Sequence, residues 1–295
     1  MALPAVLRTI CPAEVTGTVV VEAVYSLDDN HWMLRLSDTD PFILGLVGKL
    51  DPGARASRRC PPAVLSQHPW SVGSPRFTAD LAGLAAHRRF VGIRCGSAEL
   101  LAAERAGVGV LRQLAALDLQ LDFAGGWEDI RALLELLPAV PGLRVVINHM
   151  GNPRFTAGAA PDPDWLETMQ VAARHERVYM KVSALFATCP PVAEGPPAAG
   201  GSDGSPTVLP PYAPHLDALW QAFGEDRLVY GSDWPVCNNH GPDTSAVYTQ
   251  QVAVLTEWIW MKGQAAADKL FWGNAAAAYK FPPAWEGEGD AGGVT

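Results

Sequence analysis

Leu228-Val229-Tyr230-Gly231-Ser232-Asp233-Trp234-Pro235 joins a pattern typical of a buried strand to a polar strand end. The apolar run at its start follows charged residues and precedes Gly-Ser-Asp, which is typical of a strand covered on both faces. The carboxylate of Asp233 comes directly after that strand, and Pro235, which has no backbone N–H, ends it. In α/β barrels this end of each strand forms the catalytic rim. Asp also often caps turns, so the stretch alone leaves both roles open for Asp233.

The rest of the chain alternates strand-like and helix-like patterns. Strand-like runs lie at residues 18–25, 42–50, 90–95, 119–123, 143–148, 178–183 and 227–232. Helical patterns lie at residues 28–39, 77–88, 98–117, 127–137, 164–175, 212–223, 244–262 and 265–279. This alternation predicts parallel strands joined by right-handed crossovers. We expect a TIM-type (β/α)8 barrel, in the α/β class, that is incomplete at the N-terminus because only seven strands are recognisable. A doubly wound open sheet is the alternative, and the lack of a glycine-rich phosphate loop after any strand argues against it.

The length of 295 residues suits a single barrel domain, which we place at residues 1–283. Residues 187–211 are rich in Pro, Gly and Ala and predict an insertion loop over one rim. Residues 284–295 predict a disordered acidic tail.

Composition excludes several classes of partner. The formal net charge of −9 and the lack of a basic run argue against nucleic acid and against anionic membranes. No apolar run is long enough to span a bilayer, and no secretory signal pattern opens the sequence. The five cysteines are widely spaced and lack a CxxC pair, which predicts reduced thiols in the cytoplasm. We expect a small-molecule substrate, and a homo-oligomer remains possible.

Polar side chains follow most of the predicted strands. They are Glu22, Arg94, Asp122, His149, Lys181 with Ser183, and Asp233. In a barrel all of these ends face one mouth. A carboxylate that takes a proton from water, together with a cation and an imidazole that stabilise an oxyanion, forms a constellation for hydrolysis. Each residue also has a structural alternative, such as a turn cap or a buried ion pair. The chain contains no G-x-S-x-G, no H-E-x-x-H and no zinc-like His/Cys spacing.

Several motifs together resemble one known family. They are Val91-Gly92-Ile93-Arg94, Asn148-His149-Met150-Gly151-Asn152-Pro153, Val178-Tyr179-Met180-Lys181-Val182-Ser183, Arg227–Pro235 and Gly273-Asn274-Ala275-Ala276. In this order they resemble the amidohydrolase-related family of the amidohydrolase superfamily, and most closely its sugar-lactone and pyrone-dicarboxylate lactonases. The resemblance covers residues 17–281.

The resemblance implies a TIM barrel in which Asp233 activates water. It implies that His149 meets the substrate carbonyl or, in metal-dependent members, a metal ion. It makes Arg94 a candidate for substrate binding, so the expected catalytic residues are Asp233, His149 and Arg94. We expect further substrate contacts from Glu22, Asp122, Lys181 and Trp234.

The sequence departs from the family at the expected metal site. The family opens with a strand that carries His-x-His, and residues 1–16 hold no His. Asn148 occupies the position where the family usually has Asp. His149 and Asp233 alone are fewer than the three protein ligands of a catalytic zinc. We therefore predict no metal or other cofactor, with a divalent ion such as zinc possible only if a complete N-terminal strand exists.

The sequence thus predicts a hydrolase that opens a small-molecule lactone by general-base activation of water. Two alternatives remain at this point. One is a catalytically inactive barrel, either a truncated isoform or a binding protein, which the missing first strand motivates. The other is a metal-dependent decarboxylase of the same superfamily.

Overall fold

The computed structural model describes residues 15–22, 26–50, 73–96, 104–156, 158–188, 209–236 and 244–281. The predicted acidic tail, residues 284–295, lies outside the described residues, and so does most of the predicted insertion at residues 187–211. The division into these segments and a single domain at residues 1–283 therefore stays a prediction.

Seven parallel strands form one curled sheet, and they pair in the order in which they occur in the chain. The strands are β1 (Thr18–Val21), β2 (Ile43–Gly48), β3 (Phe90–Gly96), β4 (Gln120–Ala124), β5 (Arg144–Ile147), β6 (Val178–Val182) and β7 (Leu228–Tyr230). Within the described ranges β1 and β7 are the two ends of this sheet. The curl is that of a half-barrel, which confirms the prediction of an incomplete (β/α)8 barrel with seven recognisable strands.

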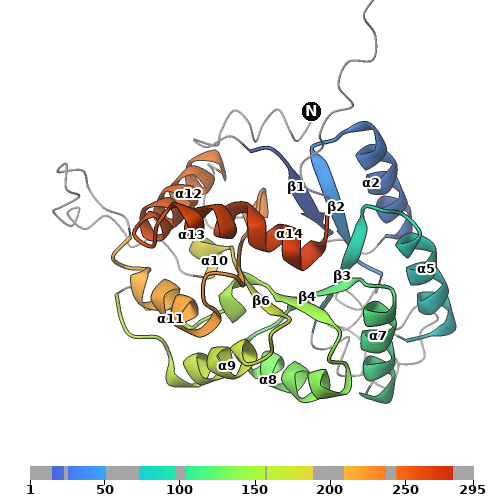
Figure 1. Ribbon diagram of the computed structural model, residues 1–295, viewed down its shortest axis with the longest axis horizontal. Coiled ribbons are helices and arrows are strands. Elements are labelled where there is room, and N and C mark those ends of the chain that lie inside the picture. Colours follow the sequence, from blue (N-terminus) through green and yellow to red (C-terminus); the bar gives the residue numbers. More distant parts are fainter. Residues whose placement is uncertain are drawn as a thin grey trace, which may run out of the picture.

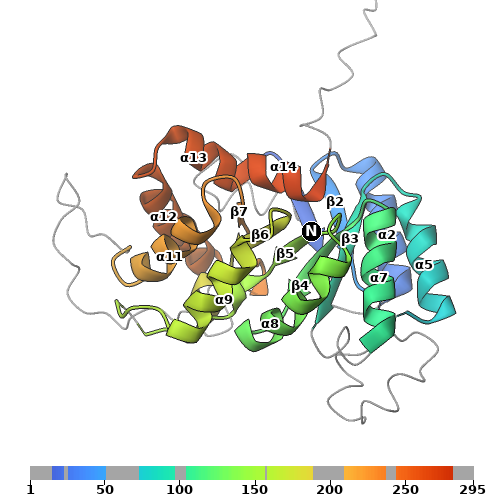
Figure 2. The ribbon, with the colours of Figure 1, turned by 60° about the horizontal axis from the view of Figure 1, so that its bottom comes forward.

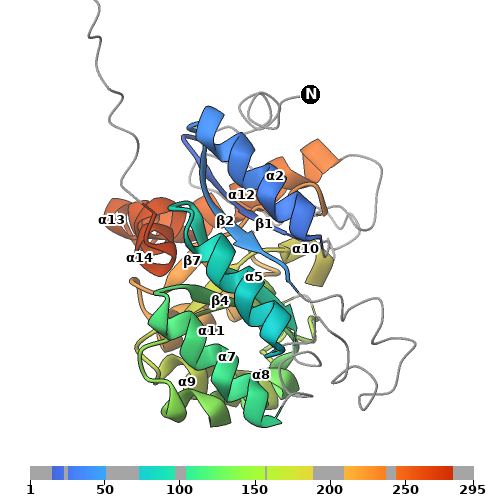
Figure 3. The same cartoon turned by 90° about the vertical axis from the view of Figure 1, so that its right-hand side faces the viewer.

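Helices cover the outside of this curl. They are α2 (Leu27–Thr39), α5 (Pro75–Ala85), α7 (Glu104–Ala116), α8 (Trp127–Leu136), α9 (Pro163–Ala173), α11 (Ala213–Phe223) and α12 (Thr244–Trp260). Figure 1 shows them as a ring around the strands, and Figure 3 shows α2, α5 and α7 one after another along one side. Short helical segments complete the chain, namely a 3-10 turn at Leu137–Ala139, another at His149–Gly151, and α10 (Leu185–Thr188). None of the helices in the described ranges is long and apolar enough to cross a membrane.

Short polar side chains begin several of the outer helices. The Ser26 hydroxyl accepts a hydrogen bond from the backbone N–H of Asp29, and Ser74 does the same for Phe77. Asp162 accepts from the backbone of Asp164 at the start of α9. Such caps satisfy backbone donors that have no partner inside the helix.

The C-terminal helical region differs from the single helix that we expected at residues 265–279. It consists of α13 (Gln264–Asp268), a π-helical turn at Lys269–Gly273, and α14 (Asn274–Tyr279). Figure 1 shows α14 over the centre of the ring instead of among the outer helices, and Figure 2 shows it beside α13 along one edge of the molecule.

The concave side of the sheet is filled from this C-terminal end. Val146 and Val229 pack there with Ala278, Tyr279 and Phe281 in one buried cluster. The guanidinium of Arg144, at the start of β5, donates from Nε to the carbonyl oxygen of Ala278 at 2.9 Å. The inside of the half-barrel is therefore a packed core at the amino ends of the strands, and the carboxyl ends stay available for a site.

Asn274 explains part of the Gly-Asn-Ala-Ala motif. Its side chain is buried, and Nδ2 donates to the backbone oxygens of Glu225 and Leu228, both at 2.8 Å. These two bonds join α14 to the start of β7, the strand that leads into Asp233. Asn274 thus positions that strand from inside the structure.

We expect Asn274→Ala to lower the free energy of unfolding by about 1–3 kcal/mol, because the buried backbone oxygen of Leu228 in β7 and the part-buried one of Glu225 before it lose their donor. Urea unfolding monitored by circular dichroism measures the change. Gln264→Ala is the control, since the Gln264 side chain forms an exposed hydrogen bond to Asp268 on the same helix. Equal effects of the two substitutions would contradict this role for Asn274.

Candidate active site

The carboxyl ends of the strands bring several predicted site residues to one rim. Arg94 of β3 is in register with Asp122 of β4, and Lys181 lies on β6. His149 starts the short 3-10 turn directly after β5. Asp233 follows β7 within the same rim. Parallel strands that end at one edge place these groups around a common opening.

A buried ion pair lies below this rim. Lys181 Nζ donates to Asp122 Oδ1, and both side chains are almost completely enclosed. The other carboxylate oxygen, Oδ2, accepts from Gln120 Nε2 at 3.1 Å and from the Tyr279 hydroxyl at 2.9 Å. Burial and the nearby Asp122 carboxylate raise the pKa of Tyr279, so its phenol stays protonated and donates. Both oxygens of this carboxylate thereby accept hydrogen bonds from within the protein.

Two glycines make room for this ion pair. A Cβ atom at Gly231 would lie 2.8 Å from Cβ of Ser183 and 3.0 Å from Cδ of Lys181. A Cβ atom at Gly92 would lie 2.6 Å from Nε2 of Gln120. Only glycine permits these side chains to cross their neighbouring strands. This accounts for Gly231 in the Gly-Ser-Asp-Trp-Pro motif.

His149 is a neutral imidazole near neutral pH. Burial, followed by the charges of Lys181 and Arg94, lowers its pKa from 6.5 to about 4. Its Nδ1 lies 2.9 Å from the hydroxyl oxygen of Ser183. If the serine hydroxyl donates to Nδ1, the tautomer carries its proton on Nε2, which is then a hydrogen-bond donor; the opposite tautomer makes Nε2 an acceptor.

Asp233 is a half-buried carboxylate in the same electrostatic field. Burial raises its pKa above 3.8, and the positive charges of Arg94 and Lys181 oppose that rise. The same two cations act on His149. Because charge interactions of this kind weaken with distance, these shared effects group Asp233, His149, Arg94 and Lys181 around one region.

The backbone at the rim is held in unusual conformations. Asp233, His149 and Ala184 have φ values of 53°, 55° and 51°, in the left-handed region that most residues with a side chain avoid. His149 and Ala184 lie two residues after β5 and β6, and Asp233 lies three residues after β7. Such strain persists only where the surrounding structure holds it, and it is enriched at functional sites.

Gln251 supplies part of that support. This residue of α12 is fully buried, and its Nε2 donates to the backbone oxygens of Gly231 and Ser232 at 3.1 and 3.2 Å. Its Oε1 accepts from the backbone N–H of Leu185 at 3.0 Å. One side chain therefore fixes the segment before Asp233 and the start of α10 together.

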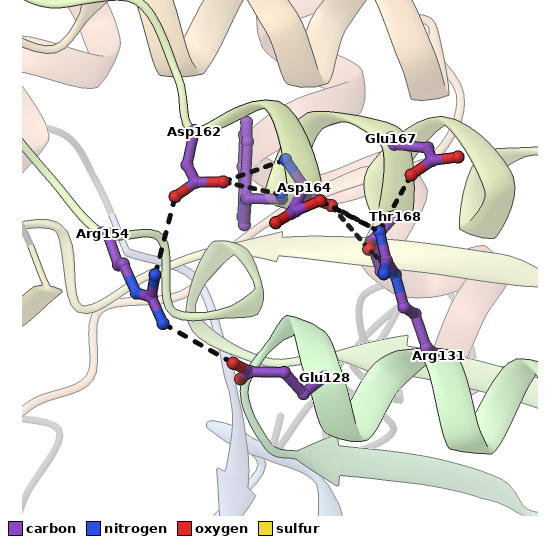
Figure 4. Close-up of polar contacts among 8 residues, drawn as sticks. Glu128, Arg131, Arg154, Asp162, Asp164, Glu167 and Thr168 are labelled. Atoms are coloured by element: carbon purple, nitrogen blue, oxygen red, sulfur yellow. Dashed lines mark hydrogen bonds and ion pairs between the residues drawn. The ribbon is translucent and has the colours of Figure 1, made fainter.

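Ion pairs on the outer surface hold the segment that follows His149. Arg154 pairs with Glu128 at the start of α8 at 3.6 Å and with Asp162 before α9 at 3.9 Å (Figure 4). Beside it, Arg131 donates to Thr168 at 2.8 Å and to Glu167 at 2.9 Å. Exposed pairs of this kind contribute little stability one by one, but they join α8, α9 and the connecting segment.

The other predicted substrate-binding residues lie in different surroundings. Asp122 is fully buried and engaged by protein donors, beneath the rim. Glu22 follows β1, and its pKa is raised by burial and by Asp29 of α2, not by the cations of the rim. Trp234 packs beside Tyr248 and Val252 of α12. The structure therefore groups Arg94, His149, Lys181 and Asp233, and Glu22 is not part of that electrostatic group.

Sequence reasoning missed several residues of this region, namely Gln120, Gln251 and Tyr279. A local signal existed for Gln120, since polar residues two apart in a strand share one face with Asp122. Gln251 and Tyr279 have no such signal, because each acts on backbone or side chains far away in the sequence.

Comparison with protein families shows to which family the chain belongs. The model of the amidohydrolase family matches residues 2–281. The chain belongs to the amidohydrolase family. The resemblance expected from the motifs is confirmed, and so is the prediction of a hydrolytic enzyme.

Two proteins of similar sequence are lactonases. L-fucono-1,5-lactonase of Burkholderia ambifaria is 26% identical over 272 residues, which cover 90% of this chain and 80% of that protein. L-rhamnono-gamma-lactonase of Scheffersomyces stipitis is 26% identical over 171 residues, which cover 55% and 48%. The crystal structure of an amidohydrolase from Burkholderia multivorans with bound zinc has a TM-score of 0.70 at 21% identity, and the match covers 95% of this chain and 89% of that one.

The prediction that this amidohydrolase needs no cofactor was wrong. Members of its superfamily are typically metal-dependent, and the amidohydrolase of similar fold from Burkholderia multivorans contains zinc. His149, with a neutral imidazole, and Asp233 have the ligand chemistry that zinc prefers. Among the residues that the structure describes, however, no group of three or more His, Cys, Asp or Glu could hold a metal ion. His149 and Asp233 therefore form an incomplete ligand set among the described residues.

Lys181→Met should destabilise the protein by about 3–5 kcal/mol, because it leaves the Asp122 carboxylate buried without its cation. Adding Asp122→Asn should recover part of that loss, since the buried charge is then gone. Thermal or urea unfolding of the single and double variants measures both effects. A loss below about 1 kcal/mol for Lys181→Met would show that the pair is solvated in solution.

The pKa of His149 should be about 4 in the folded protein, because burial and two cations disfavour its charged form. The unfolded chain then binds more protons than the folded one between about pH 4 and pH 6.5, so this group makes stability rise with pH in that window. NMR titration of ring-labelled histidine, with the His149 signal assigned through His149→Gln, measures the value. A titration near pH 6.5 would contradict the enclosed environment.

Proposed function

We propose that this amidohydrolase opens the ring of a small lactone, sugar-derived or carboxylated, with Asp233 as the general base. The observation that carries this proposal is the half-buried Asp233 carboxylate, which shares the cations Arg94 and Lys181 with a neutral imidazole at the same rim. The names of the two curated relatives, both sugar lactonases, support the substrate class.

The reaction needs one water molecule and one proton carrier. Asp233 takes a proton from water, and the water oxygen forms a bond to the lactone carbonyl carbon. The carbonyl electron pair moves onto its oxygen and returns as the ring C–O bond breaks. The ring oxygen then receives the proton from the Asp233 carboxyl group, and the product is an open-chain hydroxy acid. No electrons are gained or lost.

Arg94 and His149 act on charge that forms at the carbonyl oxygen. A guanidinium offers several N–H donors and suits an oxyanion or a substrate carboxylate. His149 contributes a donor without adding a charge, in the tautomer that keeps the proton on Nε2. Lys181 is already bonded to Asp122, so it contributes mainly its field.

Four further residues keep proposed roles at the substrate, namely Trp234, Glu22, Asp122 and Lys181. Trp234 adjoins the base and offers an apolar face for a sugar ring. Glu22 keeps its proposed role as a substrate contact from its strand-end position alone. Asp122 and Lys181 pair with each other below the rim, so their proposed role at the substrate is confined to the electrostatic field of that pair. A cytoplasmic location, a homo-oligomer and the absence of nucleic-acid or membrane partners stay predictions from composition and cysteine usage.

Asp233→Asn should reduce kcat by about 100-fold or more, because the amide cannot accept the proton of water. Aldonic 1,5-lactones, gamma-lactones and pyrone lactones are assayed by acid release, each with and without added zinc. Asp226→Asn is the matched control: Asp226 lies just before β7 and pairs on the surface with Lys269. The kcat/KM of the wild type should rise with pH through an apparent pKa above 3.8.

Activity of Asp233→Asn within a few-fold of the wild type would remove Asp233 from the role of base. Release of carbon dioxide in place of acid from carboxylated substrates would favour a decarboxylase. Wild-type protein that turns over no lactone, with or without zinc, would contradict lactone hydrolysis itself.

A further inference from the structure

Asn148 carries a buried hydrogen-bond donor that the protein does not use. Its side chain is 2% exposed, and Nδ2 has no hydrogen-bond partner among the described residues. Its backbone groups, by contrast, are paired, with Phe123 on one side and Gly151 on the other. A buried amide donor without a partner costs free energy, so native structures keep few of them outside functional sites. This donor is therefore available to a ligand.

The strand geometry directs this side chain into the half-barrel. Along β5, Arg144 and Val146 face the concave side, where they contact α14 and Tyr279. Val145 and Ile147 belong to the outer core, against the helices. Asn148 keeps an extended backbone, with φ −78° and ψ 151°, so the alternation continues and its side chain faces inward. It does so at the carboxyl end of the strand, where the rim residues gather.

Most neighbouring polar groups on the inward side are already engaged. Lys181 and Gln120 both donate to Asp122, and His149 is bonded to Ser183 through Nδ1. The amide of Asn148 is a further neutral donor among these groups, beside Nε2 of His149, and it has no partner among the described residues. A neutral donor can meet a carbonyl oxygen before charge develops and strengthen its bond as charge appears, which is what an oxyanion site requires. An aspartate at this position could only accept.

We propose that the side-chain amide of Asn148 donates a hydrogen bond to the carbonyl oxygen of the lactone and stabilises the negative charge that forms there. This inference deepens the proposed function and rests on it. Asn148 is then a catalytic residue, opposite in task to Asp233: one binds the oxygen that gains charge, and the other accepts the proton of the attacking water.

The test compares variants of Asn148 in the full chain, with zinc supplied to all samples. Asn148→Asp keeps the size and removes the donor, and Asn148→Ala removes the donor without adding a charge. Both should lower kcat by about 100- to 1000-fold while KM changes by about threefold or less. Asn152→Asp is the matched control, because Nδ2 of Asn152 bonds only to the exposed backbone oxygen of Gly125 and Asp tolerates its left-handed backbone. It should stay within about twofold of the wild type.

A second readout separates catalysis from folding. A cyclic phosphonate mimics the tetrahedral oxyanion, and its affinity should fall in Asn148→Ala by a factor similar to the fall in kcat/KM. Asn148→Ala should unfold at nearly the wild-type urea concentration, since the lost donor Nδ2 has no hydrogen-bond partner among the residues that the structure describes.

The possible outcomes distinguish the two proposals. Wild-type turnover of a lactone with unchanged kcat in Asn148→Ala would overturn the role of Asn148 and leave lactone hydrolysis intact. A wild type without lactonase activity would overturn both. If Asn148→Asp does not fold, Asn148→Ala decides the question alone.

Discussion

The buried ion pair between Lys181 and Asp122 is the constraint on which the arrangement of this site depends. An ion pair taken out of water is tolerable only when the remaining acceptor and donor positions are also satisfied. Gln120 and the Tyr279 hydroxyl complete the carboxylate, so three strand or helix segments must approach closely. This requirement brings α14 into the concave side of the sheet and keeps the Lys181 charge directly beneath the rim.

One electrostatic field has opposite consequences for the two reactive groups above it. For Asp233, burial favours the protonated acid and the cations favour the carboxylate, so the two effects partly cancel. For His149, burial and the cations both favour the neutral ring, and its pKa falls to about 4. A carboxylate that can accept a proton and an imidazole that carries no charge therefore coexist at one rim. This division of roles suits attack of water on a carbonyl, and it needs no special property of either residue beyond its position.

The rim is supported by amides that do no chemistry in the proposed reaction. Gln251 fixes the backbone before Asp233, and Asn274 fixes the strand that leads to it. Both side chains are buried and bonded to backbone oxygens, whereas the amide of Asn148 is buried and has an unused donor. Gln251 and Asn274 therefore stabilise the backbone of the rim, whereas Asn148 is a candidate for contact with a ligand. Membership of the family fixes neither the substrate nor the metal ligands. The hydrogen bonds of individual side chains distinguish Asn148 from the two supporting amides.

Local sequence patterns determined much of the architecture. The apolar runs before Arg94, His149 and Asp233 predicted β3, β5 and β7 to within two residues at each end, because strands buried on both faces are recognisable without tertiary context. The same runs located the strand-end groups, because parallel strands place their carboxyl ends at the same edge of the sheet. Tertiary structure alone decided which of those groups meet: Tyr279 bonds to a carboxylate 157 residues away, and Glu22 responds to Asp29 instead of the rim cations. It also decided that Asn148 has an unused donor. Hydrogen-bond partners distant in sequence, and the desolvation that shifts a pKa, are properties of the packed molecule, and no local pattern carries them.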